Sequence, residues 1–235
     1  MKVIEPLFLN DLYEELENSK YDIKKLTKLR ERVSKIKIFD PACGSGNFLI
    51  ISYKELSKLE SKIISYAKDL GHQIMSYSGV SLNSFYGIEI DDFAHEIARL
   101  SLWLAQHQMN QYFDGMFGIM KATLPLKESG KIVCGNATRI DWNEVCPRKD
   151  QVVGEYEIYV VGNPPYLGSR NQEDEQKEDL KNLFVSDYKS LDYISAWFYK
   201  GAKYISGHEN IRLAFVSTNS ISQGLQVSLL WPRIF

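Results

Sequence analysis

Apolar residues at helical spacing open the chain and predict two helices before the first strand. Ile4, Leu7 and Phe8 fall on one side of a helix, and the same pattern continues to Leu16. A second run with helical spacing occupies residues 22–34. The sequence therefore predicts a helical lead that packs one apolar face against the rest of the protein.

After this lead, short apolar runs alternate with longer amphipathic ones. Strands are predicted at residues 35–40, 85–90, 131–134, 157–161 and 211–216. Helices are predicted at residues 47–70, after Asp91, and at 191–206. Alternating strands and helices indicate an α/β fold with a parallel sheet covered on both faces. We therefore divide the chain into an N-terminal helical segment, residues 1–35, and a core, residues 36–235.

Two of the predicted helices carry side chains that we assign to ordinary structural roles. The helix after the second strand has a stripe that we expect to face the core, formed by Phe93, Ile97, Leu100 and Leu104. Trp103 and Trp197 also fall on helices and are assigned to the core. The charged run at 173–179 is expected to form a solvated helix or a lid.

A glycine-rich turn follows the first predicted strand, in the run DPACGSGN at 40–47. Gly44 and Gly46 let the backbone pass close to a ligand, and the helix N-terminus beyond them offers unpaired N–H groups. Leu49 stands where a dinucleotide fingerprint needs its third glycine, and no Gly-Lys-Ser/Thr follows, so a phosphate-rich cofactor is disfavoured. Asp40 at the strand end suits a ligand with a cationic amine. The alternative is a plain strand–helix turn.

Two further polar residues follow neighbouring strands. Glu89 ends the second strand, where a carboxylate can accept both hydroxyls of a ribose. Asp91 and Asp92 are available to cap the next helix, which leaves Glu89 free for a ligand. Asn136 follows the third strand and is placed either to hydrogen-bond an adenine edge or to form a turn.

The run VVGNPPY at 160–166 follows the fourth strand and is the most specific motif of the chain. Pro164 and Pro165 lack N–H groups, so this strip presents carbonyl acceptors, and Asn163 adds the acceptor Oδ1. Two acceptors that hold the hydrogens of a planar amine favour a pyramidal nitrogen whose lone pair faces a methyl donor. Placement then carries most of the catalysis. Tyr166 offers a ring on which a base can stack.

Composition bears on compartment and partners. The net charge of -2 shows no basic excess, so we expect weak DNA binding by this chain alone. Three cysteines without a paired spacing and four histidines without ligand-like spacing predict neither a disulfide framework nor a metal site. The sequence shows no membrane-spanning apolar run and no signal-peptide pattern, and we predict a cytoplasmic protein.

These motifs together resemble the class I S-adenosylmethionine-dependent methyltransferases that act on amino groups, and most closely the MmeI-like restriction–modification adenine methylases. The resemblance is carried, in order, by residues 3–9, 40–49, 86–91, 162–166, 191–197 and 214–221. It implies a Rossmann-like sheet with S-adenosylmethionine as cofactor. It also implies the N6 amine of adenine in DNA as the methyl acceptor.

The resemblance further implies a role for individual residues. The implied cofactor-binding residues are Asp40, Ala42, Gly44, Gly46, Glu89, Ile90, Asn136 and Asp192. The implied catalytic residues, which hold the target adenine, are Asn163, Pro164, Pro165 and Tyr166. Within the first set, Glu89 would bind the ribose, Ile90 would pack on the adenine, and Asp192 would help to close the site. Asn136 stands where many relatives carry an acid that reads the adenine amine.

Alternatives to this function stay open. Asn-Pro-Pro-Tyr also occurs in relatives that methylate RNA guanine or a protein glutamine amide. The family fold has a cofactor-binding segment before the position where this chain starts. It also has an antiparallel hairpin and a target-recognition domain after the position where the chain stops. We therefore expect a fragment that contacts DNA through the longer protein, and a third possibility is an inactive fragment that at most binds S-adenosylmethionine.

Overall fold

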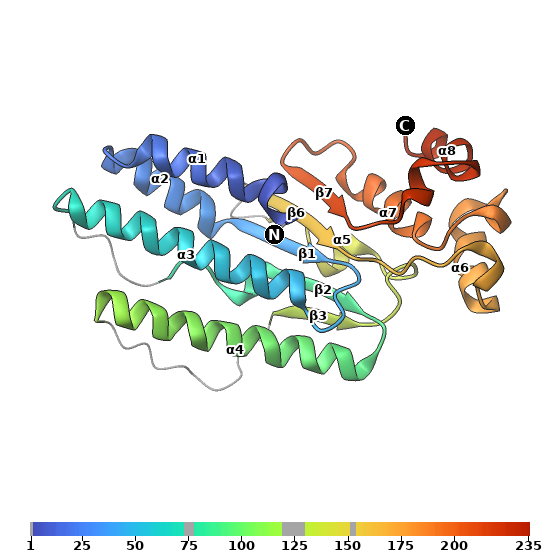
Figure 1. The fold of residues 1–235 in the computed structure, drawn as a ribbon, viewed down its shortest axis with the longest axis horizontal. Helices are drawn as coiled ribbons and strands as arrows, with labels where there is room; N and C mark the ends of the chain where they lie inside the picture. The colour runs from blue at the N-terminus through green and yellow to red at the C-terminus, as the bar shows by residue number, and fades with distance from the viewer. Residues whose placement is uncertain (1, 73–77, 119–129, 151–153) are drawn as a thin grey trace.

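The computed structural model describes residues 2–72, 78–118, 130–150 and 154–235, and its centre is a five-stranded parallel sheet (Figure 1). The strands are β1 (Ile36–Asp40), β2 (Phe85–Glu89), β3 (Lys131–Cys134), β6 (Glu157–Gly162) and β7 (Ile211–Phe215). Their order is β3-β2-β1-β6-β7, so the direction of winding reverses between β1 and β6. Open α/β sheets bind ligands at such a reversal, beyond the carboxyl ends of the strands. The predicted α/β class is confirmed.

Helices cover both faces of this sheet (Figure 1). They are α1 (Asn10–Ser19), α2 (Ile23–Ser34), α3 (Asn47–Asp69), α4 (Asp92–Phe117), α5 (Trp142–Val145), α6 (Asp174–Phe184), α7 (Ser195–Ile205) and α8 (Leu225–Leu230). The shorter elements are the π-helix η1 (Glu5–Leu9), the 3-10 turns η2 (Leu82–Ser84), η3 (Ser169–Asn171), η4 (Tyr188–Ser190), η5 (Asn219–Ser222) and η6 (Trp231–Arg233), and the antiparallel strands β4 (Lys149–Asp150) and β5 (Gly154–Glu155). Every predicted strand and helix is present, with ends shifted by a few residues.

Two apolar cores separate the layers, because successive strand residues point to opposite faces of the sheet. In one core, η1 and the four helices α1, α2, α3 and α4 pack on one face of the sheet. In the other core, α5, α6 and α7 pack on the opposite face. The helical lead thus packs into the same core as β1 and β2, through fully buried side chains such as Phe8 and Leu26. The domain boundary at residue 35 stays a prediction, since the lead and the sheet share this core.

The first strand is buried along its whole length, although its sequence alternates between lysine and apolar residues. Lys37 is only 5% exposed, and its Nζ donates to the carbonyl of Pro147 at 2.7 Å. The same ammonium group lies 3.4 Å from the ring centroid of Tyr156. The polar position within β1 is therefore a buried lysine that has partners, and neither side of this strand faces solvent.

The predicted core stripe of α4 is wrong. Phe93 is 75% exposed, and Leu100 and Leu104 are also exposed. The buried face instead carries Ala98, Leu102, Ala105, Met109 and Phe113. A Cβ atom on Gly46 would lie 3.3 Å from the Cβ of Ala98, so α4 meets the glycine turn closely through a small residue. Close packing therefore selects the face with alanines over the face with the larger apolar side chains.

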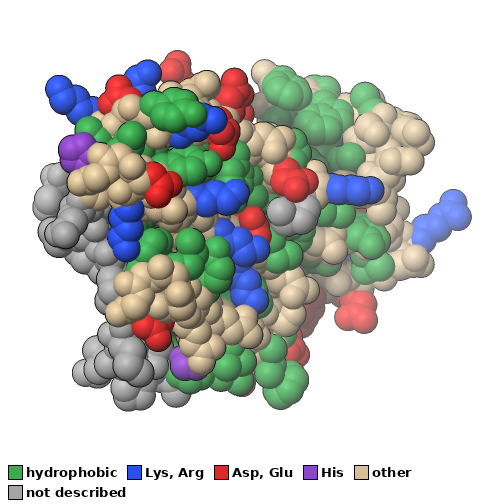
Figure 2. All heavy atoms as spheres, turned by 60° about the vertical axis from the view of Figure 1, so that its left-hand side comes forward, with side chains coloured by type: hydrophobic (Ala, Val, Ile, Leu, Met, Phe, Trp, Pro, Cys, Tyr) green, Lys and Arg blue, Asp and Glu red, His purple; other side chains and the backbone are tan. Residues whose placement is uncertain are grey.

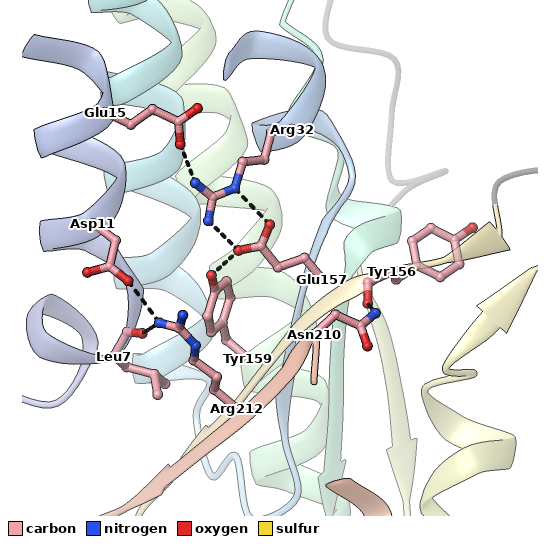
Figure 3. Close-up of polar contacts among 9 residues, drawn as sticks. All are labelled: Leu7, Asp11, Glu15, Arg32, Tyr156, Glu157, Tyr159, Asn210 and Arg212. Carbon is pink, nitrogen blue, oxygen red and sulfur yellow. Dashed lines mark hydrogen bonds and ion pairs between the residues drawn. The ribbon is translucent and has the colours of Figure 1, made fainter. Parts of the chain in front are cut away.

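A network of charged side chains joins the helical lead to the amino-terminal end of β6 (Figure 3). Arg32 donates to both carboxylate oxygens of Glu157, at 2.9 and 2.6 Å, and also pairs with Glu15. The Tyr159 hydroxyl donates to Glu157 as well. Figure 2 shows this side of the molecule, where acidic and basic side chains lie interspersed. We call Glu15, Arg32, Glu157 and Tyr159 the amino-end cluster.

Candidate functional site

A cavity of about 450 Å³ lies at the carboxyl ends of the strands. Its walls come from the turn after β1, the end of β2, the turn after β3, the strip after β6, and α6. Five of the predicted cofactor-binding residues line it: Ala42, Gly44, Glu89, Ile90 and Asn136. Two of the predicted catalytic residues, Asn163 and Pro165, line it too. The fold therefore brings four separate sequence motifs to one space.

The glycine turn and the end of β2 are tied together by Glu89. Its Oε2 accepts the N–H of Gly44 at 2.7 Å, and its Oε1 accepts the N–H of Asp91 at 2.9 Å. Asp91 itself caps α4 by accepting the N–H of Ala94 at 2.7 Å, as predicted. Glu89 therefore has structural hydrogen bonds, but a carboxylate has about four acceptor positions and keeps some for a ligand.

Asp40 lies beneath the cavity wall. It is 1% exposed, its Oδ1 accepts the N–H of Ala42 at 3.0 Å, and its Oδ2 has no hydrogen-bond partner among the described residues. Burial raises the pKa of this carboxyl to about 7, against the hydrogen bond from Ala42 and with a contribution from the charge of Glu89. A Cβ on Gly162 would lie 2.8 Å from Oδ1 of Asp40, so the glycine before the strip makes room for this carboxyl.

Gly46 supports the site from outside the cavity wall. It has a left-handed φ of 85° and precedes the first residue of α3. A side chain at this position would be strained by that backbone conformation and would press on Ala98. Gly46 thus holds the turn close to α4.

The strip divides into exposed and buried residues. Asn163 is exposed at the cavity, Pro164 is buried behind it, and Tyr166 is 51% exposed beside it. Asp192 does not line the cavity: its Oδ1 accepts the N–H of Leu167 at 2.9 Å. Asp192 therefore fixes the loop that follows the strip, and the structure shows no direct contribution of its side chain to the cavity wall.

Several wall residues were not predicted as site residues, among them Trp197, Asp179 and Tyr193. Trp197 was assigned to the core, and it is buried, but it also lines the cavity and donates from Nε1 to the carbonyl of Pro41 at 3.0 Å. Asp179 was assigned to a solvated charged run; α6 does form there, yet Asp179 is 2% exposed and lines the cavity, as does Tyr193. A buried Trp needs an acceptor for its N–H, and for Trp197 this acceptor is in the turn after β1. This need was the one feature of the sequence that could have pointed Trp197 toward the site.

The lining is rich in carboxylates. Glu89, Glu173, Glu175 and Asp179 all contribute to the wall. Such a wall favours a cationic ligand over a polyphosphate. Within the described residues, no group of three or more His, Cys, Asp or Glu is arranged to hold a metal ion, and no helix is long and apolar enough to cross a membrane.

Comparisons with known proteins agree with this arrangement. Residues 15–235 match the family described as "MmeI, DNA-methyltransferase domain". The chain is 52% identical over 238 residues to "DNA methyltransferase A" of Bacillus subtilis (strain 168), which covers 100% of this chain and 26% of that protein. A stretch of 75 residues, 32% of this chain and 6% of the relative, is 44% identical to a putative type II restriction enzyme and methyltransferase of Methanocaldococcus jannaschii.

The similarity extends to three dimensions. A solved structure of the Type IIL restriction-modification enzyme MmeI in complex with DNA matches with a TM-score of 0.88 and 41% identity, over 98% of this chain and 31% of that chain. The chain spans only 26% and 31% of the lengths of these two relatives. The predicted family and fold are confirmed, and the chain belongs to the MmeI family of DNA-methyltransferase domains.

Proposed function

We propose that this domain transfers the methyl group of S-adenosylmethionine to the N6 amine of adenine in DNA, as part of a restriction–modification enzyme. The observation that carries the proposal is that Asn163 and Pro165 share one cavity with Glu89, Ile90 and Asn136. A strip suited to holding a planar amine thus lies beside residues suited to holding a nucleoside. The family and the DNA-bound relative support DNA as the substrate.

The residues of the cavity fit S-adenosylmethionine. The buried Oδ2 of Asp40 has no partner among the described residues, and a cationic amine near the glycine turn would supply one. Glu89 keeps acceptor positions for ribose hydroxyls. Ile90 is 67% exposed at the cavity and offers an apolar surface for an adenine. When bound, the cofactor supplies an electrophilic methyl group.

The strip provides the acceptors for the target amine. In our proposal, Oδ1 of Asn163 and the carbonyl of Pro164 accept the two hydrogens of the exocyclic amine. The ring of Tyr166 stacks on the flipped base. Because Leu167 is held by Asp192, the strip is anchored on both sides, by β6 and by this hydrogen bond. Such rigidity favours catalysis that depends on placement.

The test is methyl transfer by the intact protein that contains this domain. With labelled S-adenosylmethionine and DNA, the label should appear in N6-methyladenine after digestion to nucleosides. RNA and protein offered in parallel test the alternatives of guanine and glutamine amide. Label in RNA, in protein or in another DNA base, with none in N6-methyladenine, would contradict the proposal. The family match and the DNA-bound relative favour DNA over both alternatives.

Cofactor binding is tested separately on this chain. Calorimetric titration with S-adenosylmethionine should show one site, and Glu89→Gln should weaken it. Asp174→Asn is the matched control, because Asp174 is fully exposed on α6 and does not line the cavity. Equal binding by wild type and Glu89→Gln would remove Glu89 from the site, and absence of binding by the wild type would support an inactive fragment.

A further inference from the structure

The buried carboxylate of Asp179 is the centre of a hydrogen-bond network on the cavity wall. It accepts Nδ2 of Asn136 at 2.9 Å, Nε of Arg139 at 2.6 Å and the hydroxyl of Tyr193 at 2.8 Å. Burial acts to raise the pKa of Asp179, but the hydrogen bonds from Arg139, Asn136 and Tyr193 outweigh it and hold the pKa below its usual value. The group is therefore an anion at neutral pH.

The same network fixes the orientation of the Asn136 amide. The N–H of Thr138 and its hydroxyl donate to Oδ1 of Asn136, at 2.9 and 2.7 Å. The opposite end of the amide faces the carboxylate of Asp179, which can only accept. The amide oxygen has two lone pairs, and both are used. Asn136 therefore presents one remaining N–H hydrogen and no free acceptor.

Asp179 retains an acceptor where Asn136 does not. A carboxylate has about four acceptor positions, and three of those on Asp179 are occupied by Asn136, Arg139 and Tyr193. The position that remains is on Oδ1, which among the described residues accepts only from Arg139. Both Asp179 and Asn136 line the cavity. This corner of the wall thus offers one anionic acceptor beside one amide donor.

An adenine edge has the complementary pattern, with an exocyclic amine that donates next to a ring nitrogen that accepts. The corner also lies where a nucleoside base would fall. Gly135 donates its N–H to the carbonyl of Glu89 at 2.7 Å, so the turn that carries Asn136 is attached to the end of β2. A ribose at Glu89 leaves its base between Ile90 and this turn.

We propose that Asp179 is the residue of this domain that recognises the 6-amino group of the cofactor adenine, while Asn136 donates to the adjacent ring nitrogen. The assignment rests on the proposed cofactor. It adds Asp179 to the expectation drawn from the sequence, which placed Asn136 either at the adenine edge or in a turn. The alternative is a purely structural role, in which the ion pair of Asp179 with Arg139 holds α6 against the segment that follows β3.

The experiment compares two ligands that differ only at the purine 6-position. One is S-adenosylhomocysteine, and the other is its analogue with unsubstituted purine in place of adenine, which lacks the amine and keeps the ring nitrogen. Each is titrated calorimetrically into the wild-type chain, Asp179→Asn, Asn136→Ala and the exposed control Asp174→Asn. A structural loss weakens both ligands together, so the ratio of the two dissociation constants isolates recognition of the amine.

The wild type and Asp174→Asn should prefer the adenine ligand by at least about tenfold, as expected for a hydrogen bond to a charged acceptor. Asp179→Asn should reduce this preference to a few-fold or less. Asn136→Ala should weaken both ligands and keep the preference, because Asp179 remains.

Three results would overturn the assignment: no preference in the wild type, a preference unchanged in Asp179→Asn, or a preference abolished in Asn136→Ala. If Asp179→Asn does not fold, the ligand preferences of the wild type and of Asn136→Ala still test the assignment. Failure of both ligands to bind the wild type would instead contradict the proposed cofactor, and the assignment with it.

Discussion

The molecule has two polar clusters built from the same chemistry at opposite ends of its sheet, and both are partly exposed. In the amino-end cluster, Arg32 bridges Glu15 and Glu157 where β6 begins (Figure 3). In the carboxyl-end cluster, Arg139 meets Asp179 beside Asn136 and Tyr193. Each contains a guanidinium, a carboxylate and a tyrosine hydroxyl. Residue types alone do not tell the two clusters apart.

Their surroundings differ. The carboxylate of Glu157 is used by Arg32 and Tyr159, and neither residue lines the carboxyl-end cavity. Asp179 lines that cavity and keeps an acceptor position. In a parallel sheet the carboxyl ends of the strands carry the ligand site. Location along the strand therefore separates a cluster that stabilises the fold from one that is available to a ligand.

The largest effect is expected from Asn163→Ala at the carboxyl end. Removing one acceptor for the target amine should lower methyl transfer by the intact protein about 100-fold or more, by analogy with the loss of one positioned transition-state contact. Stability should change little, because Asn163 is exposed. Rates of N6-methyladenine formation and thermal unfolding together measure this. Asn18→Ala, exposed on α1, is the control, and equal activity of both variants would refute a catalytic role for Asn163.

The reverse outcome is expected from Glu157→Gln at the amino end. It should lower the free energy of unfolding by about 1–3 kcal/mol, since Arg32 loses one of its two charged partners, and leave cofactor affinity unchanged. Burial opposes ionisation of Glu157, but Arg32 and Tyr159 lower its pKa below the usual value. Its stabilisation is therefore present above the ordinary glutamate pKa and is lost as pH falls through the depressed one. Urea unfolding at pH 7 and pH 3 should show the difference between variant and wild type shrinking in acid.

Asp40 should respond to pH in the opposite direction. Its pKa is raised to about 7 by burial, so its contribution to stability is complete below the ordinary aspartate pKa and is lost as pH rises through 7. Cofactor binding should instead strengthen several-fold from pH 6 to pH 7.5, because a cationic amine requires the ionised carboxyl. Asp40→Asn should flatten both profiles. A pH-independent affinity in the wild type would separate Asp40 from the cofactor amine.

The smallest effect is expected from Asp11→Asn beside the amino-end cluster. Asp11 pairs with Arg212 at 2.8 Å, and both side chains are about half exposed, at 51% and 53%. Such a pair contributes about 0–1 kcal/mol, so the unfolding midpoint should hardly move. A loss of unfolding free energy as large as that of Glu157→Gln would contradict this. It would show that the exposed pair of Asp11 and Arg212 and the amino-end cluster stabilise the fold as one network (Figure 3).

The sequence predicted the order of strands and helices because each carries its own local pattern. The runs at 36–40 and 157–162 are short and mostly apolar, and the Asn-Pro-Pro-Tyr strip is a specific combination of residues after a strand. Asp91 was identified as a helix cap, and it accepts the N–H of Ala94. These features depend on neighbours in the chain, which a sequence displays directly.

The failures concern contacts between distant segments. The stripe through Phe93 is more hydrophobic than the true inner face of α4, but Ala98 is small enough to approach Gly46. Asp179 looks like one acid in a charged helix until the fold places it against Asn136 and Arg139. No local pattern encodes either contact, since the partners are far apart in the chain.

The pairing of β1 with β6 also bears on how the protein folds. Ile38 is paired with Tyr159 in this ladder, so β1 and β6 can pair only after most of the chain has been synthesised. Loop closure over such a separation is slow, and it leaves one edge of β1 unpaired in the meantime. During synthesis, the glycine turn therefore emerges long before the strip that completes the cavity. The cavity is among the last parts of the domain to form, because the strip after β6 supplies part of its wall.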